Sequence, residues 1–138
     1  MVTTNILPDL QAAILCEDVR QEINGSQTLV GVINVIPAPV VPIGLFKLCL
    51  WSRWCGGTGE FEQESFVMSC DDDAPIAQAI VRFRLPALDA HATNVHVFGG
   101  IQFPKHGLYH IEIRIDDQIR LRFPLAVVAV QNQQPGIA

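Results

Sequence analysis

Four histidines fall in one stretch of the sequence, at His91, His96, His106 and His110. Imidazole nitrogens bind zinc and take part in acid–base catalysis. If the strands that carry His96 and His110 pair around the sequence PKHG, the two rings lie many residues apart along the ladder. If the chain instead crosses between two sheets there, the two rings face opposite surfaces. We therefore expect solvated histidines on strands, with no bound metal and no cofactor.

The sequence CDDDAP (residues 70–75) places three carboxylates in a row. Calcium takes several oxygen ligands from a flexible loop. Three adjacent side chains cannot all point toward one ion, and no second acidic loop is evident in the sequence. We predict a solvated turn. The alternative is a small-ligand or metal-binding module that uses this loop and the nearby histidines.

The cysteines are Cys16, Cys49, Cys55 and Cys70, and no two of them form a CxxC motif. This spacing predicts buried or half-buried free thiols. Cys55 precedes a Gly-Gly pair and is the thiol we expect to be most exposed, so a thiol enzyme centred on Cys55 is a further alternative. Nothing in the sequence supplies the third member of a catalytic triad or an oxyanion hole.

The sequence LFKLCLWSRWCGG (residues 45–57) predicts a strand with two different faces. One alternate set is apolar apart from Ser52 and predicts the core side: Phe46, Leu48, Leu50 and Trp54. The other set is Lys47, Cys49, Trp51 and Arg53. Aromatic and Arg side chains are typical anchors of protein interfaces, so these four are the candidate interface residues. The other interpretation is that a loop such as IPAPVVPIG covers this face, or that the cations stack on the indole.

Composition limits the classes of partner. The 138 residues are 49% hydrophobic and 17% charged, with a net charge of −5. This net charge argues against nucleic-acid binding, which requires a basic face. We expect one domain over residues 1–130 and a polar tail over residues 131–138. The start MVTTNILPDLQ has no signal-peptide pattern, and prolines interrupt the most apolar window, so we expect no membrane span and a cytoplasmic location.

Alternating residues predict a hairpin near the end of the chain. Every second residue from Tyr109 to Ile115 is apolar, and the alternation resumes from Ile119 to Leu125. Parity predicts a three-residue loop, Asp116-Asp117-Gln118, because a two-residue loop would pair inner with outer residues. This register sets Glu112 opposite Arg122 on a solvated face.

Other segments also favour strands. Asn24-Gly25 predicts a hairpin turn between two extended runs. The apolar parity of residues 61–70 switches, which predicts a bulge near Gln63–Ser65. PALDAHA is the best candidate for a helix, of about one turn, and we expect a stiff crossing or edge segment in VIPAPVVPIG. The residues expected to point inward in the two strands after the acidic turn are Val81, Phe83, Leu85, Val95, Val97, Ile101 and Phe103. In all, the sequence predicts eight strands.

The sequence HGLYHIEIRID resembles the Gly-x-Tyr approach to the penultimate strand of immunoglobulin-like sandwiches. The resemblance implies that the hydroxyl of Tyr109, the only tyrosine, bonds a backbone group a few residues upstream. Ile111 stands where antibody-type domains have a cysteine, so the inter-sheet disulfide of those domains is absent.

The whole chain also resembles an uncharacterised bacterial family of short single-domain proteins. The matching residues are AAILCEDVRQEINGSQTLVGV and GLYHIEIRIDD…RFPLAV. This resemblance implies a bacterial origin and no known activity.

Taken together, these observations predict an all-β, immunoglobulin-like antiparallel sandwich of about seven to nine strands with little or no helix. We expect a non-enzymatic protein-binding or assembly module that contacts a protein partner, or a second copy in a homo-oligomer.

Overall fold

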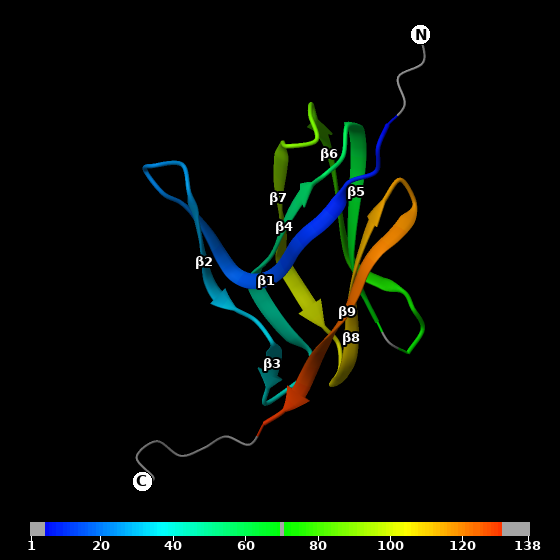
Figure 1. Ribbon diagram of the computed structural model, residues 1–138. Helices are drawn as coiled ribbons and strands as arrows, with labels where there is room; N and C mark the ends of the chain where they lie inside the picture. Colours follow the sequence, from blue (N-terminus) through cyan, green and yellow to red (C-terminus); the bar gives the residue numbers. More distant parts are fainter. Residues whose placement is uncertain (1–4, 70, 131–138) are drawn as a thin grey trace.

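The computed structural model describes residues 5–69 and 71–130, so Cys70 and the predicted tail lie outside the described residues. Figure 1 shows this part of the chain as strands joined by turns, and none of its segments is a helix long and apolar enough to cross a membrane. The described strands are β1 (Asp9–Gln21), β2 (Gln27–Val32), β3 (Val35–Ala38), β4 (Ile43–Cys55), β5 (Gly59–Met68), β6 (Pro75–Leu85), β7 (His91–Phe103), β8 (Gly107–Ile115) and β9 (Gln118–Ala129).

The strands form two sheets that pack as a sandwich, as predicted. One sheet has the order β2-β1-β4-β7 and the other the order β3-β9-β8-β5-β6. The segment expected to be a proline-rich connection leaves the first sheet after β2, adds β3 to the edge of the second, and returns to β4. The pairing of β3 with β9 is parallel, whereas the other strand pairs are antiparallel, as expected.

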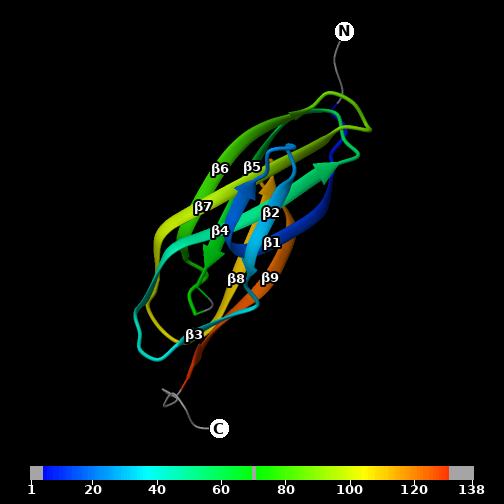
Figure 2. The same ribbon diagram turned by 90° about the vertical axis from the view of Figure 1, so that its left-hand side faces the viewer.

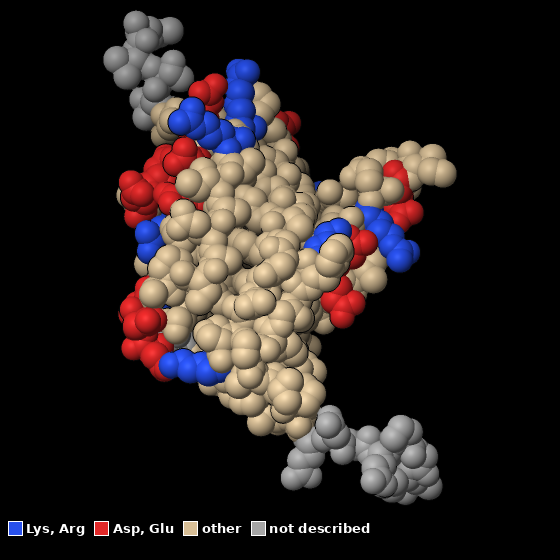
Figure 3. Space-filling model, turned by 180° about the vertical axis from the view of Figure 1, so that it is seen from behind, with Lys and Arg blue, Asp and Glu red and all other residues tan. Residues whose placement is uncertain are grey.

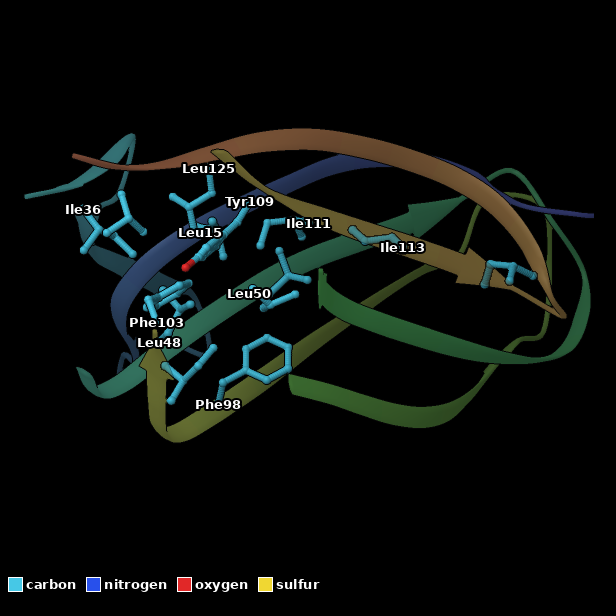
Figure 4. Close-up of a cluster of buried hydrophobic side chains, with 14 of the residues drawn as sticks. Leu15, Ile36, Leu48, Leu50, Phe98, Phe103, Tyr109, Ile111, Ile113 and Leu125 are labelled. Carbon is cyan, nitrogen blue, oxygen red and sulfur yellow. The ribbon is translucent and has the colours of Figure 1, made fainter. Parts of the chain in front are cut away.

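Apolar side chains from both sheets meet in the middle of the sandwich. Figure 4 shows Leu48, Leu50 and Phe98 of one sheet facing residues of β8 from the other. Tyr109, Ile111 and Ile113 are buried, as their alternation predicts. The ring of Tyr109 also stacks on Phe103, with 5.0 Å between ring centroids.

A layer of polar side chains lies inside this core, and it explains why the predicted bulge at Gln63–Ser65 is wrong. The ladders of β5 with β6 and with β8 run without interruption through these residues, and the one irregularity lies later, between Val67 and Met68. Gln63 and Ser65 point inward and are fully buried, whereas Phe66 is buried on the outer side of the sheet. The apolar parity therefore switches without any change in the backbone.

Inward-facing residues switch parity together in β4 and β7. Phe46 was expected in the core but is 93% exposed, and Val97 is 53% exposed rather than buried. The position opposite Phe46 is Gly100, whose φ of +66° favours glycine. Both strands twist at this point, so the alternate positions that face the core before it face solvent after it. Before Gly100, β7 points Asn94, His96 and Phe98 inward; after it, Ile101 and Phe103.

The β8–β9 hairpin confirms the pairing of Glu112 with Arg122 but not the predicted loop. Ile115 pairs with Gln118, so the loop is Asp116-Asp117, and both residues have positive φ, as a type I′ turn requires. A register shift after Ile113 restores the parity that the shorter loop would have broken.

Glu112 is not solvated as expected; its side chain is 5% exposed. Arg114 holds the carboxylate at 2.5 Å, and the Arg114 guanidinium lies 4.6 Å from the ring centroid of Phe66, the partner of Glu112 on β5. The outer face of the second sheet is thus covered at this point by an ion pair that packs on an aromatic ring.

The β1–β2 hairpin projects from the sandwich as an arm, which we define as residues 17–32 (Figure 1). β1 pairs with β4 from Asp9 to Cys16 and then leaves it, and β2 pairs only with β1. Figure 2 shows β1 and β2 passing over β4 when the molecule is seen from the side of the arm.

Candidate protein-binding surface

The four predicted interface residues lie on the outer face of β4, at the place where the arm meets the sheet. The Lys47 Nζ is 2.5 Å from the carboxylate of Asp18 at the root of the arm. The indole N–H of Trp51 donates to the Gln27 side chain at 2.7 Å. Both residues therefore connect β4 to the arm.

The arm covers this face only in part. Arg53 lies over the Trp51 ring at 5.6 Å, and both side chains are half-buried. Cys49 is fully buried, with its Sγ 3.8 Å from the backbone oxygen of Glu17, so it does not reach the surface. The covering element is the arm and not the proline-rich segment, and Trp51 remains partly accessible.

Charge at the arm root is locally balanced. The hydrogen bond from Lys47 lowers the pKa of the Asp18 carboxyl, and the same bond raises the pKa of Lys47. Because both side chains remain partly exposed, solvent and salt screen the pair, and it orients the arm more than it stabilises it.

An apolar groove, which was not predicted from the sequence, lies beside this face. The groove has a volume of about 620 Å³ and is lined by Phe46, Leu45, Ile33, Val35, Ile36 and Pro37, with the Lys47–Asp18 pair and Glu17 also at its wall. Its apolar lining comes from β3, β4 and the β2–β3 link. The signal that could have found it is Gly99-Gly100 inside a strand, because such glycines mark a bulge or a bend.

Formal charge is distributed unevenly over the surface. β7 contains no Lys, Arg, Asp or Glu, and Figure 3 shows a broad uncharged face when the molecule is seen from behind. Acidic side chains line one side of this view. The uncharged side chains of the sequence therefore gather on this face.

The candidate metal ligands do not come together. His106 contacts the Ala38 carbonyl oxygen through Nε2 at 2.8 Å, whereas His96 is buried in β7. Asp71 forms an ion pair with Lys105, and Asp73 lies 3.4 Å from Arg122. In the part of the chain that the structure describes, no group of three or more His, Cys, Asp or Glu side chains is placed to hold a metal ion.

Cys55 stands in a row of residues that sequence reasoning did not connect. Its register partners are Asp9 on β1 and His91 on β7, so the three side chains share one face. The thiol lies in the middle of this row. A Cys-His-Asp relay needs the imidazole between the thiol and the carboxylate, so the order does not match that of a triad.

The residues expected to have structural roles either lie in a turn or bond to the segment before a strand. The Tyr109 hydroxyl donates to the backbone oxygen of Lys105 at 2.6 Å and so holds the chain that leads into β8. Asn24 accepts from the backbone N–H of Ser26 at the tip of the arm, and the adjacent Gly25 has a φ of +89°.

A family model described as a family of unknown function (DUF6941) matches residues 11–128. The chain belongs to this family. The arm, the Phe46 groove and the buried polar layer all lie within the DUF6941 match. No curated protein matches the chain. Because the DUF6941 description carries no activity, function has to be argued from the surface itself.

Proposed function

We propose that this DUF6941 chain is a non-enzymatic protein-binding module, and that it self-associates through the apolar groove around Phe46. The single observation that supports this is the position of Phe46, which is 93% exposed beside a groove with an apolar lining. Burying a phenylalanine stabilises a contact by about 1.5–3 kcal/mol, so an unpartnered ring at such a site favours association.

Neighbouring residues extend the surface. Trp51 and Lys47 lie on the adjoining face of β4 with part of each side chain accessible. Val35 in the groove lining and Val32, which precedes Ile33 of the lining, are also exposed. An aromatic centre with a charged rim is the composition of many protein interfaces.

The test is the mass in solution, measured by size-exclusion chromatography with light scattering over a dilution series. We expect the wild-type chain to be a dimer or larger. In a two-fold symmetric dimer each copy contributes one Phe46, so Phe46→Ser should weaken association by roughly 100-fold or more. Trp51→Lys should weaken it as well if the β4 face takes part.

Ile80→Ser is the matched control, because Ile80 is an exposed apolar residue on β6, outside the groove. It should leave the mass unchanged. A wild-type chain that is monomeric at every concentration, or a Phe46→Ser variant with the wild-type mass, would count against self-association through this groove.

A bacterial origin and a cytoplasmic location belong to the same proposal. The resemblance of residues 12–32 and 107–127 to a bacterial family supports the origin, and the Tyr109 motif supports an immunoglobulin-like variant of the sandwich. The free thiols of Cys16, Cys49 and Cys55 support a reducing compartment.

A further inference from the structure

Cys16 and Cys49 are register partners on the neighbouring strands β1 and β4. Directly opposed residues of an antiparallel pair have Cα atoms about 4.5–5.5 Å apart, within the range that disulfides span. Leu15, which precedes Cys16, and Leu48 and Leu50, which flank Cys49, belong to the core. Because side chains alternate along a strand, both cysteines project from the outer face of the sheet. Opposed cysteines on one face have the placement that an intramolecular disulfide requires.

The two thiols also converge on the same backbone segment. The Sγ of Cys49 lies 3.8 Å from the Glu17 carbonyl oxygen, and the Sγ of Cys16 faces the backbone N–H of Asp18. Glu17 and Asp18 are the residues at which the arm begins. Both sulfurs therefore lie beneath the root of the arm.

The cysteine pair is the last rung of the β1–β4 ladder. Pairing runs from Asp9–Cys55 to Cys16–Cys49, and beyond that rung β1 turns away from β4. Past this point, bonds from β4 side chains hold the arm: Cys49 to the Glu17 backbone oxygen, Lys47 to Asp18, and Trp51 to Gln27. A covalent bond at the last rung would fix the point about which the arm moves.

We propose that Cys16 and Cys49 form a redox-active pair that reacts with a small-molecule disulfide and closes into an intramolecular disulfide at the root of the arm. In the first step one cysteine thiolate attacks the small disulfide, forms a mixed disulfide and releases one thiolate. In the second step the other cysteine thiolate attacks the protein sulfur of that mixed disulfide and releases the second thiolate. The two cysteines lose two electrons and two protons in total, and the small disulfide is reduced to two thiols.

Burial makes the reaction depend on motion of the arm. Cys16 and Cys49 are both fully buried, so a small disulfide reaches them only when the arm lifts from the sheet. Burial also raises the pKa of both thiols, which keeps them protonated and slow to react while they are covered. The pair therefore remains reduced until the arm opens, and the disulfide then limits further opening at its root.

The experiment uses the full chain with Cys55→Ser and Cys70→Ser as background, incubated with oxidised glutathione under native conditions. We expect a mass lower by two hydrogens, no thiol left to alkylate, and a peptide that links residues 16 and 49. The Cys16→Ser variant in the same background should stop at a glutathione adduct.

Gln27→Ala tests the role of the arm, because it removes the hydrogen bond to Trp51. Loss of one hydrogen bond should speed oxidation by about three- to tenfold. Gln78→Ala, at an exposed site on β6, is the matched control and should leave the rate unchanged. Two results would contradict a redox-active pair. One is a stable glutathione adduct in place of the linked peptide. The other is free thiols after long incubation in both the background chain and Gln27→Ala. Equal oxidation rates in the background chain, Gln27→Ala and Gln78→Ala would show that the arm does not limit access to the cysteines.

Discussion

Gln63 is the residue on which the buried polar layer depends. Its side-chain oxygen accepts from the Trp54 indole at 2.8 Å and from the Asn94 amide at 2.7 Å. Its amide nitrogen donates to the hydroxyls of Ser52 and Ser65, each at 3.0 Å. One side chain thus satisfies groups from β4, β5 and β7, and so sets how the two sheets meet.

Gln63→Leu should lower the free energy of unfolding by about 2–4 kcal/mol, because it leaves the Trp54 and Asn94 donors buried without an acceptor. Urea unfolding followed by tryptophan fluorescence measures the change. Gln78→Leu, an exposed position on β6, is the control and should change stability by less than about 0.5 kcal/mol. A Gln63→Leu chain as stable as this control would show that the layer is not held by hydrogen bonds.

His96 lies beside this layer, and its burial disfavours the protonated form of the ring. Both of its ring nitrogens are buried without a hydrogen-bond partner, and burial lowers its pKa below the ordinary value of 6.5. Below pH 6.5 the unfolded chain binds a proton that the folded chain does not bind until the lowered pKa is reached. Stability should therefore fall as the pH drops through 6.5 toward the lowered pKa of His96.

His96→Leu should remove this part of the pH dependence and stabilise the fold at pH 7.5 by about 1–3 kcal/mol, because no unpaired polar atom remains buried. Chemical unfolding of both chains at several pH values gives the comparison. The carboxyls of Asp18 and Glu64 also have shifted pKa values, but they are common to both chains and cancel in the difference. Parallel pH profiles would mean that His96 is not the group responsible.

At the scale of strands, the β8–β9 turn uses a residue that glycine would replace well. Asp117 has a φ of +69°, in the left-handed region where a side chain is strained. Asp117→Gly should raise the free energy of unfolding by up to about 1 kcal/mol. Removing this carboxylate also relieves its repulsion with Glu64, whose pKa is raised by burial and by Asp117, and both effects act in the same direction.

Asp72→Gly supplies the comparison for thermal unfolding. The φ of Asp72 is not positive, and its carboxylate accepts from the Ala74 backbone N–H at 3.2 Å. Glycine at position 72 should therefore lower the melting temperature, whereas glycine at position 117 raises it. Equal losses at the two sites would argue against strain in the turn.

Strands with ordinary alternation could be predicted from the sequence, and those with inverted alternation could not. β8 has apolar residues on its core side, so Tyr109 to Ile115 were placed correctly. In β7 the inward side chains are Asn94 and His96 while Val95 and Val97 point outward, so polarity indicates the wrong face. Parity alone cannot show which face is buried when a partner strand satisfies the polar groups.

Long-range pairing is the other part that the sequence did not reveal. Parity correctly predicted that Lys47, Trp51 and Arg53 share one face of the strand. It did not predict the element that covers this face, because the arm reaches it only after β1 bends away from the ladder. The opposition of Cys16 and Cys49 depends on the same register. Neither leaves a local signal in a chain whose contacts are mostly between residues distant in sequence.

At the scale of the whole molecule, the arm and the sandwich are held by different forces. The sandwich has a shared apolar core and the Gln63 layer, whereas side-chain bonds such as those of Asp18 and Gln27 hold the arm to β4. A segment with few buried apolar contacts opens locally, at a free energy below that of global unfolding. The arm should therefore exchange its amide hydrogens independently of the core.

Hydrogen exchange followed by mass spectrometry tests this independence with a pair of variants. Gln63→Leu lowers global stability and should speed exchange in β4 and β8, whose amides open only when the sandwich unfolds, while the arm peptides over residues 19–30 keep their rate. Trp51→Ala removes the bond to Gln27 and should speed exchange in the arm by about three- to tenfold with little change in β8. If both variants speed exchange in both regions alike, the arm and the sandwich unfold as one unit. Opposite responses would establish that the arm moves on a sandwich that remains folded, and it is this motion that exposes Trp51 and the cysteine pair.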